Sequence, residues 1–160
     1  MSEHFPAEIH IGGPIPRAVL AKLIAAALAE DASLRDYGEA PATKESLKDA
    51  FREGQIVSLY DDQARYGHFP DLEDFLVKHG IHFDRHGDSF CEFNAENVYY
   101  RGGPKTLVML ADESGNPLAS CQEIQKVLDH PSMPDRGKLK AIRRRVSPRQ
   151  MAKLTPIRFV

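Results

Sequence analysis

The chain has 160 residues, a formal net charge of −2 at pH 7, and 42% hydrophobic and 28% charged residues. This length predicts one domain with a real core, and the composition is ordinary for a soluble globular protein. No apolar run approaches the ~18 residues of a membrane span, and the N-terminal MSEHFPAEIH lacks the pattern of a signal peptide. The two cysteines, Cys91 and Cys121, are therefore expected to be reduced thiols in a cytoplasmic protein with no membrane partner.

Charge is divided unevenly along the chain. All 23 acidic residues lie at or before Asp135, together with 12 of the 21 basic residues, so residues 1–135 carry a formal charge of −11. Residues 136–160 contain nine basic residues and no acidic one, a charge of +9. An asymmetry of this kind between segments indicates an interaction tail.

The N-terminal region is predicted to form a strand, a glycine turn and a helix. Glu8 to Ile11 is the strand, Gly12-Gly13 the turn, and the helix runs from about Ile15 to Glu30, with apolar residues at helical spacing. A helix N-terminus after glycines suggests phosphate binding. The segment has neither GxGxxG nor GK[ST], however, which favours a plain glycine turn.

A second helix and a second strand follow. Thr43 is expected to cap a short helix that ends near Arg52. Gln55 to Tyr60 has strong β propensity. Asp61 and Asp62 are predicted to begin the loop after this strand.

The strongest local signals lie between Phe69 and Phe93. Pro70 suits the first position of a helix, and Gly80 suits the left-handed residue that ends it. From Ile81 the pattern alternates, so side chains point to two opposite faces. One face is predicted to hold Ile81, Phe83 and Arg85, and the other His82, Asp84 and His86. Gly87-Asp88 is predicted to turn the chain into a return strand, Ser89 to Asn94.

The rest of the body is predicted to contain two strand candidates and one helix. Asn97 to Arg101 is expected to form another strand or to continue the return strand, and Thr106 to Leu110 is expected to be a buried strand. Ser120 begins an S-x-x-E capping box, and the helix behind it has an apolar stripe that includes Cys121.

These elements predict an α+β fold, a small antiparallel or mixed β-sheet with helices packed mainly on one face. Residues 1–133 are expected to form this single domain. Residues 134–160 are expected to form a basic C-terminal tail that is partly helical and is either docked or flexible.

Three alternating polar residues on one strand face suggest a metal site. Imidazole and carboxylate groups bind Zn²⁺ and other transition metals, and His82, Asp84 and His86 offer both. Three alternating residues span roughly 13 Å, however, so they cannot all reach one ion without a bend. The favoured interpretation is a solvated strand face. A metal-dependent hydrolase using these residues remains a third functional hypothesis.

Acidic residues also gather in the middle of the sequence, namely Asp61, Asp62, Asp71, Glu73 and Asp74. Carboxylates could bind Mg²⁺ in a nuclease-like site, but no D-x-D or E-x-K pattern accompanies them. A solvated acidic surface is favoured. It gives a second hypothesis, an acidic inhibitor that mimics nucleic-acid phosphates and binds the basic site of a nucleic-acid enzyme.

Two other residue types allow both a chemical and a structural role. Cys91 could act as a thiolate beside a histidine, but a buried structural cysteine is favoured for Cys91 and for Cys121. Of the adjacent tyrosines Tyr99 and Tyr100, alternation leaves one free to stack on a base and places the other in the core.

The basic tail is the strongest functional signal. In GKLKAIRRRV, an apolar line of Leu139, Ile142 and Val146 is flanked by cations, and Ser147-Pro148 is predicted to start a second short helix. The expected binding residues are Lys138, Lys140, Arg143, Arg144, Arg145 and Arg149. Basic segments of this type bind phosphate backbones by charge neutralisation.

The leading hypothesis is a non-enzymatic binding protein without a cofactor, whose basic tail contacts nucleic acid or an acidic protein partner. The alternative for the tail is docking on the acidic body of its own chain or of a second copy, which would give a homodimer. A tail that stays disordered is the remaining alternative.

Overall fold

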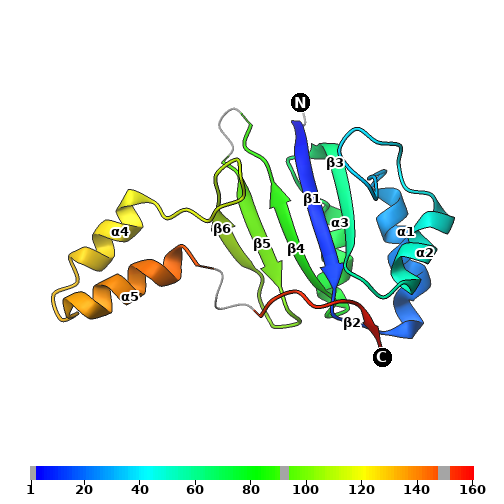
Figure 1. Ribbon diagram of the computed structural model, residues 1–160. Helices are drawn as coiled ribbons and strands as arrows, with labels where there is room; N and C mark the ends of the chain where they lie inside the picture. The colour runs from blue at the N-terminus through cyan, green and yellow to red at the C-terminus, as the bar shows by residue number, and fades with distance from the viewer. Residues whose placement is uncertain (1–2, 91–93, 148–151) are drawn as a thin grey trace.

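A five-stranded antiparallel sheet forms the centre of the protein in the computed structural model, which describes residues 3–90, 94–147 and 152–160 (Figure 1). In sheet order the strands are β3 (Val57–Arg65), β1 (His4–Gly12), β4 (His82–Gly87), β5 (Glu96–Tyr100) and β6 (Leu107–Leu110). A two-stranded parallel sheet joins β2 (Pro14–Ile15) to β7 (Arg158–Phe159). The predicted α+β class is confirmed.

The helices fall into two groups. Three pack behind the large sheet, after a short 3₁₀ turn at Arg17–Val19: α1 (Leu20–Ala29), α2 (Lys44–Arg52) and α3 (Pro70–Lys78). The other two, α4 (Cys121–Leu128) and α5 (Asp135–Arg145), extend away from the sheet on the β6 side (Figure 1). None of the helices in the described ranges is long and apolar enough to cross a membrane.

The hydrophobic core lies between the sheet and the first group of helices. Ile9 of β1 and Phe83 of β4 point into it and meet Phe51 of α2 and Leu72 of α3, all of them fully buried. Each buried side chain of this size contributes about 1.5–3 kcal/mol relative to exposure. The alternate residues of the same strands form the opposite face of the sheet, which is largely polar and is covered by none of the helices that the structure describes.

The central helix and the strand after it follow the prediction. α3 begins at Pro70 and ends before Gly80, whose φ of +66° favours glycine. Along β4 the buried residues alternate with half-buried ones, so Phe83 and Arg85 face the helices, and Asp84 and His86 face the other side.

Three strand predictions were wrong. β3 continues to Arg65, so Asp61 and Asp62 lie in the strand; pairing with β1 and the burial of Ala64 extend it past the polar residues. The partner of β4 is β5 rather than residues 89–94, of which 91–93 lie outside the described residues. In β5, Val98 and Tyr100 reach the core, and long-range packing of this kind outweighs local turn signals.

The third error concerns β6, which is an exposed edge strand rather than a buried one. Val108 and Leu110 share the helix-covered face with Val98 and Glu96 of β5. The helices do not extend over β6, so Val108 is 55% exposed and Leu110 is 42% exposed.

The end of the predicted tail packs against the body. Ile157 is buried in the core, and Arg158 N–H donates to the carbonyl of Gly13 at 2.9 Å. A Cβ at Gly12 would lie 2.3 Å from the carbonyl oxygen of Thr155, so glycine permits this close approach. Residues 152–157 form no helix, and the rest of the predicted second helix, residues 148–151, lies outside the described residues.

Candidate functional site

The two outer helices form a hairpin that we call the arm, residues 121–145. Its first helix starts with the predicted capping box: Glu123 N–H donates to Ser120 Oγ at 3.2 Å, and Ser120 N–H donates to the Glu123 carboxylate at 3.1 Å. The hydrogen bond from Ser120 N–H, with a second from the Ser120 hydroxyl at 3.1 Å, holds the pKa of the Glu123 carboxylate below its usual value. Val127 is the one buried residue of the two arm helices, so the arm is held to the body by few apolar contacts.

Helical spacing divides the basic residues of α5 between two sides. Lys138 donates a short hydrogen bond to the Leu128 carbonyl, and Arg145 lies 3.4 Å from the Glu123 carboxylate, so both face α4. Arg136, Lys140 and Arg143 recur at i, i+4 and i+7, which places them together on the outer side. All three are exposed, and none forms an ion pair with another described residue.

The predicted basic set is therefore only partly brought together. Lys140 and Arg143 share the outer side, while Arg144 lines a groove beside the sheet. Arg149 lies outside the described residues. Arg136, which was absent from the predicted set, belongs to the outer side, and its spacing of four residues from Lys140 was the available signal.

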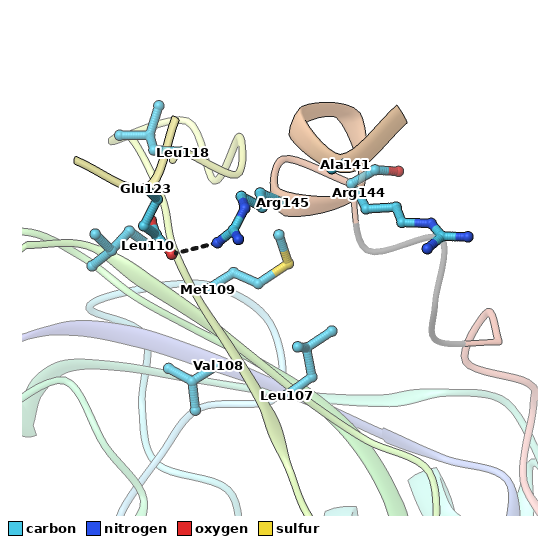
Figure 2. Close-up of a pocket in the computed structure, with 10 residues that line it drawn as sticks. Leu107, Val108, Met109, Leu110, Leu118, Glu123, Ala141, Arg144 and Arg145 are labelled. Carbon is cyan, nitrogen blue, oxygen red and sulfur yellow. Dashed lines mark hydrogen bonds and ion pairs between the residues drawn. The ribbon is translucent and has the colours of Figure 1, made fainter. Parts of the chain in front are cut away.

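A groove of about 640 Å³ separates α5 from β6 (Figure 2). One wall is apolar and comes from all four residues of β6 and from Leu118. The other wall is formed by α5, with Ala141, Arg144 and Arg145. Figure 2 shows Arg145 reaching from α5 to its ion pair with Glu123.

The uncovered face of the sheet carries a second polar region. Adjacent strands align Glu8 with His86 and His10 with Asp84. The ring of His10 lies 2.7 Å from Ser58 Oγ through Nδ1 and 3.4 Å from the Glu8 carboxylate through Nε2. The hydrogen bond from His10 lowers the pKa of Glu8.

A pocket of about 510 Å³ lies over this face, lined by Glu8, His10, Tyr37, Asp84, Arg85, His86, Asp88, Asn97, Tyr99, Glu113, Ser114 and Gly115. Burial raises the pKa of Tyr37, and the nearby carboxylates of Glu8 and Asp88 raise it further. Tyr99 faces the pocket and Tyr100 is buried, which matches the expected division between the two tyrosines.

The three residues of the metal hypothesis have separate partners. His86 lies 2.7 Å from Asn97 Oδ1 and 3.1 Å from the Asp88 carboxylate. Asp84 forms an ion pair with Arg101 at 2.6 Å. Burial, with Arg101 nearby, lowers the pKa of His82. Within the described ranges, no three His, Cys, Asp or Glu residues are grouped to hold an ion.

The predicted acidic residues also divide. Glu73 points inward, where its carboxylate lies 2.9 Å from Nε of the buried Arg85 and accepts a hydrogen bond from Phe69 N–H. Asp62, Asp71 and Asp74 are exposed.

Asp61 is half-buried, and it belongs to an acidic cluster that also contains Glu30 and Asp71. Burial raises the pKa of Asp61. Burial is also the main cause that raises the pKa of Glu30, and repulsion from Asp71, Glu73 and Asp61 adds to it. The Glu30 carboxylate accepts the N–H of Leu72 at 2.9 Å, which ties α1 to the start of α3.

The cysteine prediction was wrong for Cys121. It is exposed, because the arm does not pack its first turn against the body. Cys91 lies outside the described residues.

Comparisons with protein-family models, with curated proteins and with solved structures gave no match.

Proposed function

We propose that this is a non-enzymatic binding protein whose basic C-terminal segment contacts nucleic acid in the cytoplasm. The observation that carries the proposal is the outer side of α5, defined here as Arg136, Lys140 and Arg143. These three cations are exposed, share one side of a helix that extends from the sheet, and have no ion-pair partner among the described residues.

Phosphate neutralisation is the chemistry that this surface fits. Lysine and arginine side chains on one side of a helix can meet successive phosphates, and the release of counterions drives binding without base readout. The acidic body would be repelled by the same polyanion, which favours contact through the projecting arm. An acidic protein partner is the other outcome of the test.

The test compares charge reversals on and away from the arm. Lys140→Glu with Arg143→Glu should weaken binding of a labelled DNA duplex at least tenfold in fluorescence anisotropy. Lys22→Glu with Arg35→Glu changes the net charge equally at exposed positions of the body and is the matched control. If both double variants bind equally well, the outer side of α5 is not the binding surface.

Charge reversal is preferable to truncation in this protein. A chain cut after residue 135 would lose β7 and the buried Ile157 together with α5. A loss of binding could then reflect damage to the fold.

A second candidate, the acidic inhibitor, is supported by the acidic cluster of Glu30, Asp61 and Asp71. Glu30 follows the end of α1, Asp61 lies in β3 and Asp71 in α3, and the carboxylates of Asp61 and Asp71 both repel that of Glu30. The test is cleavage of DNA by a panel of nucleases with the protein present. Inhibition that Asp61→Lys with Asp71→Lys abolishes would support this candidate, and a panel left unaffected would count against it.

A further inference from the structure

We propose that the groove between β6 and α5 binds an extended, acidic peptide segment of a partner protein, which pairs with the free edge of β6. This site is separate from the outer side of α5. It would add a peptide-docking function to the proposed nucleic-acid contact.

The groove follows the edge of the strand rather than one face of the sheet. All four residues of β6 line it, although neighbouring residues of a strand point to opposite faces. A cavity can touch consecutive residues in this way where it lies along the backbone at the open edge.

The backbone at this edge has hydrogen-bonding groups available at Val108. Ala111 N–H donates to the Ala95 carbonyl, and pairing alternates along an antiparallel ladder. The N–H and C=O of Val108 therefore point away from β5. Leu110 has the same orientation, and its carbonyl already accepts the N–H of Leu118 at 2.7 Å. The free edge thus ends at Leu110, and an added strand would pair at Val108.

Apolar side chains surround this short edge. Val108 is 55% exposed, Leu110 is 42% exposed and Leu118 is 47% exposed. A contiguous apolar surface beside unpaired strand groups is the arrangement used for strand addition, in which backbone bonds give affinity and side-chain contacts give specificity.

The charge of the opposite wall selects the type of segment. Arg144 and Arg145 line that wall, and Glu123, the one acidic residue among the described residues that line the groove, already interacts with Arg145. Arginine binds carboxylates strongly and often with two parallel hydrogen bonds. A segment that alternates apolar and acidic residues would place apolar side chains against β6 and carboxylates near the arginines.

A second copy of this chain fits the edge less well. Two β6 strands related by a two-fold axis through Val108 would place residue 106 of the second copy beside Leu110. Leu118 already occupies that position on the first copy. A segment that leaves the edge before Leu110 avoids this conflict.

The experiment uses a fluorescein-labelled nine-residue peptide of alternating valine and glutamate, with the full-length protein at physiological salt. Binding is measured by anisotropy. Arg144→Glu with Arg145→Glu should weaken it at least tenfold. The matched control, Lys22→Glu with Arg35→Glu, makes the same charge change at exposed positions of the body and should weaken it less than threefold.

Val108→Pro tests the backbone contact, because proline removes the N–H but is tolerated on edge strands. It should weaken peptide binding at least tenfold. If this variant does not fold, slower hydrogen exchange of the Val108 amide in the wild-type protein on adding the peptide gives the same information.

Three results would overturn the proposal: no binding of the peptide, equal binding of a valine–lysine peptide, or equal weakening by the two double variants. Loss of DNA binding in Arg144→Glu with Arg145→Glu, without any peptide binding, would assign the groove to nucleic acid instead. DNA binding by Lys140→Glu with Arg143→Glu tests the proposed function separately, so failure of one proposal is distinguishable from failure of the other.

Discussion

The side chain of Arg85 lies in the core face of the sheet and is only 1% exposed. Its guanidinium donates to the Gly67 carbonyl at 3.0 Å, lies 2.9 Å from the Glu73 carboxylate and forms a short ion pair with Glu96. These contacts join α3, β4 and β5. A buried charge is tolerated because it is paired and hydrogen-bonded.

Arg85→Ala should lower the free energy of unfolding by about 3–5 kcal/mol, because Glu73 and Glu96 would lose the cation that neutralises them. Urea unfolding measures the change. The exposed residue Arg35 is the control, and its alanine variant should stay within about 0.5 kcal/mol of the wild type. A loss in Arg85→Ala no larger than that of the control would show that the ion pairs do not stabilise the fold.

Glu30 gives a prediction about pH. Burial raises its pKa in the folded state, so ionising its carboxylate costs stability. The cost is absent below the unfolded-state pKa near 4.5 and fully present above the raised folded-state pKa.

Glu30→Gln should therefore raise the free energy of unfolding at pH 7, by less than about 1 kcal/mol because the group is partly solvated. The gain should disappear as the pH falls below 4.5, while the exposed control Glu39→Gln should change little at pH 7. Urea unfolding at several pH values measures this. A gain that grows on acidification would contradict the sign.

At the scale of single elements, the accurate predictions rested on local chemistry. α3 begins at Pro70 and ends shortly before Gly80, and Ser120 caps the start of α4. These limits were predictable because capping depends on residues close in sequence. The same local rules placed Arg85 on the core face but could not identify Glu96 as its partner.

The inaccurate predictions depended on distant parts of the chain. β3 runs through Asp61 because β1 pairs with it, and β6 is exposed because the core helices end before it. The local polarity of the sequence shows neither the pairing of β3 with β1 nor the place where the core helices end. The candidate surfaces followed the same rule: the basic composition of the tail was visible in the sequence, but the groove requires β6 and α5 to be brought together.

The arm should be the least stable part of the described structure, since little apolar surface holds it. Ser120→Ala removes the cap of α4 and should cost about 0.5–2 kcal/mol locally. Faster hydrogen exchange of the α4 amides, with little change in those of β1, is the expected result. Ser132→Ala, at an exposed serine between the arm helices, is the control. Equal acceleration in β1 would mean that the arm and the sheet unfold together.

At the scale of the whole molecule, the basic C-terminal segment divides into a part that packs on the body and a part that extends from it. The final residues return to the body, where Ile157 is buried and β7 pairs with β2. The basic helix α5 instead extends beyond β6, with a cationic outer side and an arginine-lined groove on its inner side. Predicting which part of the tail docks required the contact between Gly12 and Thr155, which no local pattern records.

The most direct test of the proposed function is the salt dependence of DNA binding by the full-length protein, measured by anisotropy at about 50 mM and about 200 mM salt. Three phosphate contacts from Arg136, Lys140 and Arg143 predict an affinity that falls roughly fortyfold between these concentrations. Lys140→Glu with Arg143→Glu should abolish most of that dependence. Binding that is insensitive to salt, or unchanged in this variant, would contradict a phosphate-binding role for α5.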